Sequence, residues 1–452
     1  MAIDLAKVLE QDVEDATGCT EPIAMALASS IAYHAINGYV PGKSTREKGT
    51  LNPENIEKIV VGADRDVIKN ANAVGIPGTG QKGMKLAIAM GVFCNPELRL
   101  NLFKDVTDEL VDKANLILSK GKIEVEQIDT ESEECDVHIT ATVTYRAEEN
   151  LLTGFCEIRH KHTNVTEIRR NDEVLFDARY GKLWETKVEG GDESAKFKEE
   201  QVSILELIDF VEELPDNARK IVQHGIALCE ELSRAGLENN SGVGVGVRLN
   251  RLMDKKLGRN LITFSKYRTA AAADARMAGI PKAAISVAGS GSQGITATMP
   301  IVCVADYLGR NEEKLFQAVA LSYLITSYIS AYTGYLSALC GCVVKAAVGA
   351  AAGVAYYLGG TPQQVGNAID ILAANITGII CDGAKEGCAL KLATATTVVI
   401  ESALLALDGL KIPFDNGIVG RTPEETIRNI GRICKATVET DREIVNIILA
   451  KG

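Results

Sequence analysis

The sequence has no excess of basic residues. It carries 48 Lys and Arg against 60 Asp and Glu, a formal net charge of −12. Nucleic acids and anionic membranes attract clustered Lys and Arg, so we expect neither as a partner. Apolar residues make up 46% and charged residues 24% of the chain. This balance is typical of a folded globular protein and excludes an intrinsically disordered one.

We also expect neither a signal peptide nor a disulfide framework. Residues 1–15 are acidic and lack the apolar core of a signal peptide, and eleven cysteines is an odd number in a long chain. We therefore expect a cytoplasmic protein with reduced thiols. In that compartment, grouped cysteines more often bind metal or take part in catalysis than form disulfides.

One apolar stretch, residues 335–358, is long enough to cross a bilayer. It consists mostly of Ala, Gly and Val, and it contains Lys345 and two cysteines. Leu, Ile and Phe, which favour membrane insertion, are scarce in it. We predict a buried, closely packed helix here and no membrane span.

The length of 452 residues exceeds what a single core usually holds, so we predict two domains in an α+β fold. Helical spacing of apolar residues dominates residues 1–99 and 200–452, which we predict to form a helical catalytic body. Alternating apolar residues predict a smaller α/β domain inserted at residues 100–199. Its expected strands cover residues 137–145, 155–158 and 165–168.

A first candidate site is the sequence Gly18-Cys19-Thr20-Glu21-Pro22, which precedes a helical run at residues 23–36. Cys19 is thereby placed at a helix N-terminus, where backbone N–H groups and the helix dipole stabilise a thiolate. A thiolate ligates metals or attacks electrophiles. The alternative, which this motif alone favours, is a small buried residue beside a helix cap.

Two further cysteine segments are Leu336-Ser-Ala-Leu-Cys340-Gly-Cys342 and Gly378-Ile-Ile-Cys381, the latter followed by Cys388. Both place thiols beside glycines at predicted helix starts. The spacing matches neither paired zinc CxxC units nor a ferredoxin, so buried structural thiols are favoured for each segment alone. Three separated loop cysteines would suit a cluster with one iron open to substrate as a Lewis acid.

A glycine-rich loop runs from Ala288 to Ile295 with the sequence Ala-Gly-Ser-Gly-Ser-Gln-Gly-Ile. Its backbone N–H groups can form a nest for a substrate carboxylate, assisted by the side chains of Ser290, Ser292 and Gln293. A tight structural turn is nearly as well supported. The loop lacks the GK[ST] of a phosphate-binding P-loop, and the glycines at residues 242–246 do not fit the dinucleotide pattern.

Several side chains are candidate general bases. His162, in the triplet His162-Thr-Asn, follows a predicted strand and can act as a base or contact substrate, although an exposed strand end is the favoured alternative. Lys82, Lys385 and Lys391 lie in or next to glycine-rich loops. A lysine can act as a base where desolvation lowers its pKa. The sequence does not distinguish among these candidates.

Taken together, these segments resemble the L-cysteine desulfidase family, which is related to the iron-sulfur L-serine dehydratases. The resemblance spans nearly the whole chain and rests on six motifs in a fixed order. They begin at Gly18 (GCTEP), Pro77 (PGTG), His162 (HTN), Gly289 (GSGSQGI), Leu336 (LSALC) and Ile380 (ICDGA).

The resemblance implies a [4Fe-4S] cluster held by three cysteines, which correspond here to Cys19, Cys340 and Cys381. Cys342 and Cys388 are the neighbouring alternatives. Because the family motif fixes the cysteine directly after Leu-Ser-Ala-Leu, Cys340 is preferred over Cys342. One departure is Ser292, where the family pattern has Asn, and it leaves the substrate preference open.

The implied reaction is β-elimination of L-cysteine to hydrogen sulfide, ammonia and pyruvate. We expect the base to be His162, Lys82 or Lys385. The expected substrate contacts come from the glycine-rich loops and are Ser290, Ser292, Gln293, Gly78 and Thr79. The alternatives are serine deamination on the same cluster, a pyridoxal-phosphate lyase, and an iron- or redox-sensing protein without turnover. Ala-rich helices make a homo-oligomer plausible.

Overall fold

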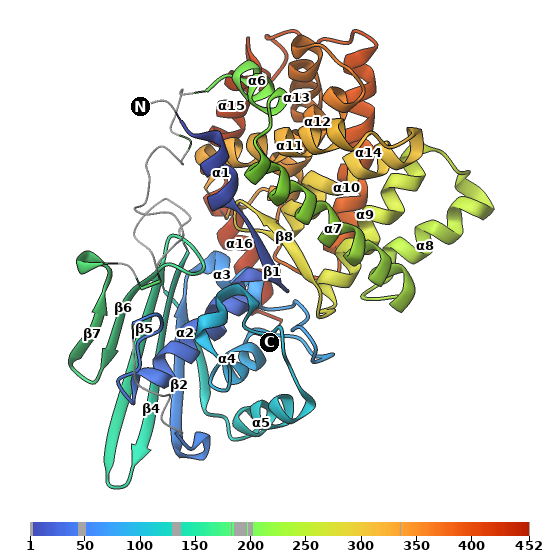
Figure 1. Cartoon of the computed structure of the whole chain (residues 1–452). Helices are drawn as coiled ribbons and strands as arrows, with labels where there is room; N and C mark the ends of the chain where they lie inside the picture. The colour runs from blue at the N-terminus through green and yellow to red at the C-terminus, as the bar shows by residue number, and fades with distance from the viewer. Residues whose placement is uncertain are drawn as a thin grey trace. The chain divides into compact units, whose positions relative to one another are not determined.

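The computed structural model describes residues 3–43, 51–128, 137–181, 183–184, 197, 202–334 and 336–451. The chain forms two compact units (Figure 1). The helical unit comprises Met1–Ala16, Asp192–Asp382 and Glu386–Glu443, and the sheet unit comprises Thr17–Gly191, Gly383–Lys385 and Ile444–Gly452. Helices and a mixed sheet in separate units confirm the predicted α+β class.

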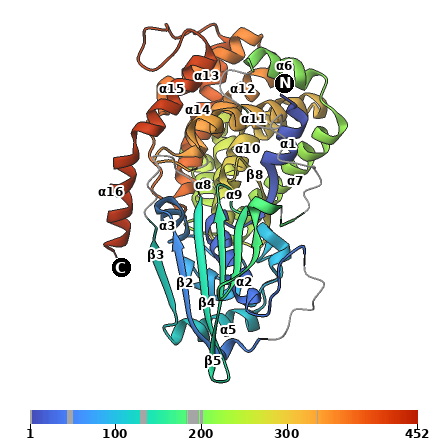
Figure 2. The ribbon, with the colours of Figure 1, turned by 90° about the vertical axis from the view of Figure 1, so that its left-hand side faces the viewer.

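The sheet unit is built on six strands in the order β3-β2-β4-β5-β6-β7 (Figure 2). The pair β2–β3 is parallel and the other pairs are antiparallel. The strands are β2 (Ile56–Ala63), β3 (Ile123–Gln127), β4 (His138–Ala147), β5 (Asn150–Arg159), β6 (Val165–Arg170) and β7 (Glu173–Asp177). The three strands predicted from alternating apolar residues are therefore confirmed as parts of β4, β5 and β6.

Helix α2 (Thr20–Ala35) is the buried centre of the sheet unit, and every residue in it except His34 is buried. It packs against β4 and β5 on one side and against α4 (Met84–Gly91) on another. A Cβ atom on Gly154 would lie 1.9 Å from the carbonyl oxygen of Ala32, so β5 approaches the helix backbone directly. Packing along the whole of α2 therefore fixes the position of its first residue, Thr20.

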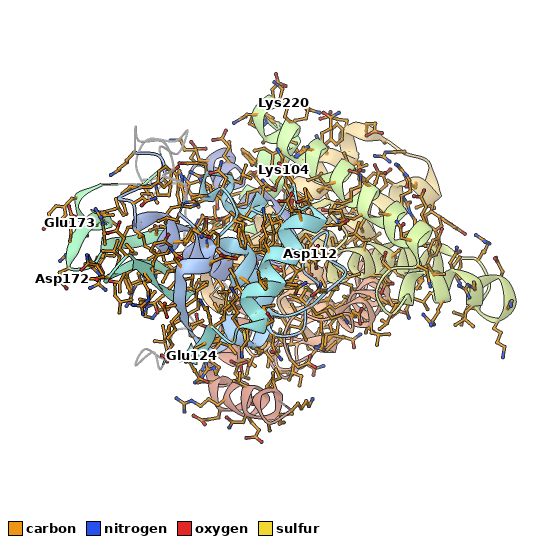
Figure 3. All side chains as sticks on the ribbon, turned by 90° about the horizontal axis from the view of Figure 1, so that it is seen from below. Lys104, Asp112, Glu124, Asp172, Glu173 and Lys220 are labelled. Carbon is orange, nitrogen blue, oxygen red and sulfur yellow. The ribbon has the colours of Figure 1, made fainter. Side chains whose placement is uncertain are left out.

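The other helices of the sheet unit are short. They are α3 (Arg65–Ala71), α5 (Asp108–Ser119) and the 3-10 helices at Pro53–Asn55, Pro96–Asn101 and Ala178–Tyr180. Charged side chains cover the outside. Asp112 on α5 and the adjacent pair Asp172 and Glu173 point into solvent, as Lys220 does on the helical unit (Figure 3).

The unit boundaries differ from the predicted domain division. Residues 17–99 group with the strands that follow them and not with the helical body. Two long-range contacts explain this: α2 packs on the sheet, and β2 lies between β3 and β4. The second predicted boundary, at residues 199–200, lies outside the described part of the chain.

The helical unit contains a two-stranded sheet of β1 (Val13–Thr17) and β8 (Ala283–Val287) and a large set of helices. Its helices are α1 (Leu5–Asp12), α6 (Ile204–Glu212), α7 (Asp216–Asn239), α8 (Val245–Leu252), α9 (Leu261–Met277), α10 (Gly291–Leu308), α11 (Glu312–Thr333), α12 (Val348–Tyr357), α13 (Pro362–Ile376), α14 (Cys388–Leu407) and α15 (Pro423–Ala436). A last helix, α16 (Val438–Leu449), crosses the division between the units.

Most of the apolar segment at residues 335–358 forms the buried helix predicted for it, but the described residues 336–340 lie in a loop before the helix. A π-helix (Cys342–Ala347) continues into α12, and all its residues beyond Cys342 are buried, including Lys345. Glycine permits the close packing, because a Cβ on Gly349 would lie 2.4 Å from the carbonyl oxygen of Ser322 on α11. Tyr335, the first residue of the predicted segment, lies outside the described residues.

In the part of the chain that the structure describes, two helices, α11 and α14, are long and apolar enough to cross a membrane by length and composition alone. Within the structure, 83% of the apolar window of α11 and 56% of that of α14 are buried. Core helices of globular proteins are buried in this way. Packing in the helical unit therefore explains the apolar composition of α11 and α14.

Candidate functional site

Two loops of the helical unit pair with each other and bring Cys340 and Cys381 together. The backbone N–H of Cys340 donates to the carbonyl oxygen of Ile379 at 2.8 Å, and that of Cys381 donates to Ala338 at 2.7 Å. An isolated antiparallel bridge between Leu339 and Ile380 results. Two segments 41 residues apart in sequence, around Leu339 and Ile380, are thereby paired, and each carries a cysteine next to the bridge.

Four thiols gather at this ladder: Cys340, Cys342, Cys381 and Cys388, here termed the thiol cluster. The sulfur of Cys340 is hydrogen-bonded to those of Cys342 and Cys381, and Cys388 lies close enough to interact electrostatically. The bond with Cys342 raises the pKa of Cys340 above its usual range, and the opposing bond with Cys381 does not offset it. Cys340 is buried, whereas the other three thiols are partly exposed.

Lys391 lies beside the thiol cluster but is held as a cation. Its ammonium group donates to the carbonyl oxygen of Ile380 at 2.8 Å and pairs with Asp382. Burial alone would lower the pKa of Lys391. The hydrogen bond to Asp382 and the nearby thiols have the larger combined effect, so the pKa of Lys391 is raised. A lysine in this state is a poor base at neutral pH. Lys391 is therefore not favoured as the general base.

The glycine-rich loop packs against the segment that carries Cys340 and Cys342. Ser290 precedes α10, and Ser292 and Gln293 lie in the first turn, both buried. A Cβ atom on Gly341 would lie 2.8 Å from Nε2 of Gln293, so this side chain packs against the residue between Cys340 and Cys342. Oε1 of Gln293 is buried and has no hydrogen-bond partner. Two of the sequence motifs therefore meet in the helical unit.

The third predicted cysteine, Cys19, belongs to the sheet unit and is the N-cap residue of α2, as predicted. Its thiol donates to Oε2 of Glu21 at 2.9 Å. Glu21 is itself buried and accepts from Nδ2 of Asn70 at 2.9 Å. Gly18 adopts a φ of +88°, and a Cβ there would lie 2.4 Å from Pro77, so the first two sequence motifs lie against each other.

His162 is the most deeply buried of the candidate bases. The prediction favoured an exposed strand end, but the side chain is only 4% exposed, and Nε2 is buried without a hydrogen-bond partner. Burial lowers the pKa of His162 below 6.5, and the carboxylate of Glu21 opposes this with a smaller effect. The imidazole is therefore neutral at pH 7, the form that accepts a proton.

The remaining candidates from the sequence also lie in the sheet unit. The hydroxyl of Thr79 is engaged within its own turn, because it donates to Ile76 at 2.8 Å and accepts from the backbone of Gln81 at 3.0 Å. Gly78 and Lys82 are exposed. Lys385 is half-buried, and its ammonium group donates to the carbonyl oxygen of Gly383 at 3.3 Å.

A model of the serine dehydratase alpha chain family matches residues 97–446, which is most of the chain. This chain belongs to that family. The sequence resemblance to the group of cysteine desulfidases and iron-sulfur serine dehydratases is thereby confirmed. The family is one of lyases of the dehydratase type, and dependence on an iron-sulfur cluster is a property of the family.

Full-length relatives support the same assignment. A UPF0597 protein of Desulforapulum autotrophicum is 36% identical over 100% of this chain and 98% of its own. A UPF0597 protein of Clostridioides difficile is 35% identical over 98% of both chains. A third, from Caldanaerobacter subterraneus, is 34% identical over 99% of this chain and 98% of its own. The similarity to these relatives therefore covers the residues of both units.

Sequence reasoning about this serine dehydratase relative missed two polar residues next to the candidate sites. Glu21 lies in the GCTEP motif without a predicted role, yet its carboxylate accepts a hydrogen bond from Cys19 and acts electrostatically on His162. Arg276 donates from Nη1 to Oγ of Ser292 at 2.8 Å and is 2% exposed. Its only signal in the sequence is a charged residue within an Ala-rich helix.

Within the described part of the chain, no three Cys, His, Asp or Glu side chains converge on one point as a single metal ion requires. A cluster makes a different demand, because each thiolate binds a different iron atom and the ligands can be farther apart. Thiols are the ligands that such clusters use. The donor set in the two hydrogen-bonded loops therefore fits an iron-sulfur cluster better than a mononuclear metal.

A buried carboxylate in the sheet unit gives a prediction for stability. Asp64 accepts from the backbone of Asp66 at 2.8 Å and of His138 at 2.8 Å, and burial raises its pKa from 3.8 to about 7. The folded state then holds this proton more tightly than the unfolded state does. The resulting stabilisation is complete below pH 4 and is lost as the pH rises to 7.

Asp64→Asn should remove this contribution to the pH dependence of the free energy of unfolding. Relative to wild type, we expect the variant to gain about 2 to 3 kcal/mol in free energy of unfolding between pH 5 and pH 8. Urea titrations at the two pH values measure the gain. The exposed Asp108→Asn serves as a matched control, and an equal pH dependence of wild type and Asp64→Asn would contradict the assignment.

Proposed function

We propose that this protein is an L-cysteine desulfidase. L-Cysteine loses its α-proton and its hydrosulfide, and the aminoacrylate product tautomerises and reacts with water to give pyruvate and ammonia. The observation that carries the proposal is the paired loops that hold Cys340 and Cys381 together with Gln293 of the glycine-rich loop beside them. In this proposal the thiols would hold the cluster and the loop would bind the substrate carboxylate.

The proposed cofactor is a [4Fe-4S] cluster ligated by Cys19, Cys340 and Cys381. When bound, such a cluster supplies a thiophilic Lewis acid through the iron that no cysteine ligates. The thiol of Cys19, which donates to Glu21, would give up this proton on binding iron, because the thiolate is the ligating form.

His162 is the proposed general base. A base for a weakly acidic α-proton must be neutral at the working pH and must have a free nitrogen. His162 meets both conditions, because burial lowers its pKa and its Nε2 has no partner. Glu21 stabilises the imidazolium that forms when the proton is taken up, since its carboxylate raises the pKa of the ring. Lys82 is exposed and Lys385 donates to a carbonyl group, so both are weaker candidates.

The glycine-rich loop is the proposed binding site for the substrate carboxylate. The backbone N–H groups of the first turn of α10 have no acceptors within the helix, and the helix dipole favours an anion at this end. Ser290 makes no side-chain capping bond, which leaves these N–H groups available. Gly78 and Thr79, in the sheet unit, stay expected contacts.

Deamination of L-serine on the same cluster is the second candidate, because the matching family is named for serine dehydratase. Anaerobically purified protein should be assayed with each amino acid under the same conditions. The desulfidase proposal predicts sulfide and pyruvate in equal amounts from L-cysteine and a much smaller kcat/KM for pyruvate formation from L-serine. The reverse preference would support the dehydratase, and turnover of neither would support an iron- or redox-sensing protein.

A further inference from the structure

The helical unit has an open cavity of about 410 Å³ that is lined by none of the candidate site residues. Pockets of this size take small molecules. The cavity lies where the starts of α6 and α15 meet α11. Its polar lining residues are Ser203, Glu206, Tyr328, Thr422, Glu424 and Arg428.

Arg428 supplies positive charge to this cavity. Glu424 lies four residues earlier on α15, at the spacing that favours an ion pair on a helix, but its Oε1 accepts from the backbone N–H of Ile204 at 2.8 Å instead. Within the described part of the chain, the guanidinium group of Arg428 makes no hydrogen bond and no ion pair. It is therefore available to a ligand, and a guanidinium group binds a carboxylate through two parallel hydrogen bonds.

Two carboxylates, those of Glu206 and Glu424, line the same cavity. Glu206 completes the capping box of α6, where its Oε2 accepts from the backbone N–H of Ser203 at 2.7 Å. Each carboxylate thus uses one oxygen to cap the start of α6, and an ionised carboxylate has further acceptor sites on its other oxygen. Both can therefore accept hydrogen bonds from a cationic ligand without losing their structural role.

The cavity presents two negative groups and one positive group, so a complementary ligand has two positive groups and one negative group. We propose that it binds an amino acid with a cationic side chain, whose carboxylate pairs with Arg428 and whose two cationic groups pair with Glu206 and Glu424. The buried Tyr328, which is 1% exposed, forms the wall between these charges. This binding is separate from the proposed reaction, because none of these residues has a part in it.

The test uses L-lysine as the probe and the full-length protein. Isothermal titration calorimetry should show that L-lysine binds to wild type and that Arg428→Gln weakens the binding by about 10-fold, because a charged hydrogen bond is lost. Cadaverine, which is L-lysine without its carboxylate, should bind equally to both. The double variant Glu206→Gln and Glu424→Gln keeps an acceptor oxygen for each cap and should bind both compounds more weakly. L-Norleucine, which lacks the side-chain ammonium group, should bind to wild type more weakly than L-lysine.

Arg432→Gln is the matched control, because Arg432 is exposed one turn later on α15 and is not among the lining residues. Asp209→Asn, at an exposed position of α6, is the control for the carboxylates. Both controls should bind L-lysine as wild type does. No binding of L-lysine to wild type, equal affinity of folded Arg428→Gln and wild type, or equal affinity of wild type for L-norleucine and L-lysine would each overturn the proposal.

Discussion

Cys340→Ala is expected to abolish both bound iron and sulfide release from L-cysteine. Cys340 is the buried member of the thiol cluster, and its sulfur contacts those of both Cys342 and Cys381. Alanine removes the thiolate that the cluster needs, and the neighbouring backbone hydrogen bond to Ile379 does not depend on the side chain. Iron content and sulfide production, measured on the same anaerobic sample, should both fall to background.

Cys342→Ala provides the matched comparison, because it removes a thiol from the same cluster two residues away. Its iron content should stay close to that of wild type if Cys340 is the ligand. A variant Cys340→Ala that keeps its iron while Cys342→Ala loses it would transfer the assignment to Cys342. Full activity of Cys340→Ala without iron would refute the cluster mechanism itself.

His162→Gln is expected to lower kcat for L-cysteine by roughly 100- to 10,000-fold, the usual contribution of a general base, with little change in KM. Glutamine keeps a polar group of similar size but cannot take up a proton. The control is His224→Gln, since His224 is exposed and pairs with Asp15 in the helical unit. Its kcat should match that of wild type.

The pH profile gives a second check on His162. Because burial lowers its pKa, the neutral imidazole persists below pH 6.5. The acidic limb of kcat/KM, which reports the free enzyme, should therefore fall below pH 6.5 in wild type. This limb should be absent from the residual activity of His162→Gln. An unchanged kcat in this variant would shift the role of base to Lys385 or Lys82.

Local patterns in the sequence predicted local structure well. Alternation of apolar residues predicted the strands now seen as β4, β5 and β6, and the Ala- and Gly-rich run predicted the buried helix from Cys342 to Tyr357. The position of Cys19 before a helical run predicted its place as an N-cap residue. In each case the signal lies within a few consecutive residues, where backbone geometry and burial determine the pattern.

Contacts between distant segments could not be predicted in the same way. The grouping of residues 17–99 with the sheet depends on β2, which pairs with β3 and β4 from later in the chain. The burial of His162 and its proximity to Glu21 depend on a contact across more than 100 residues. Arg276 lies on a helix with no motif, and only tertiary packing brings it to the glycine-rich loop.

The most direct test of the account is a joint measurement on one anaerobically purified sample of the wild-type protein. Iron and acid-labile sulfide should be counted per chain, and sulfide release from L-cysteine should be assayed before and after the cluster is removed with a chelator. We predict about four irons and four sulfides per chain and a sulfide release that is lost with the iron. Undiminished sulfide release from protein without iron would contradict the central claim.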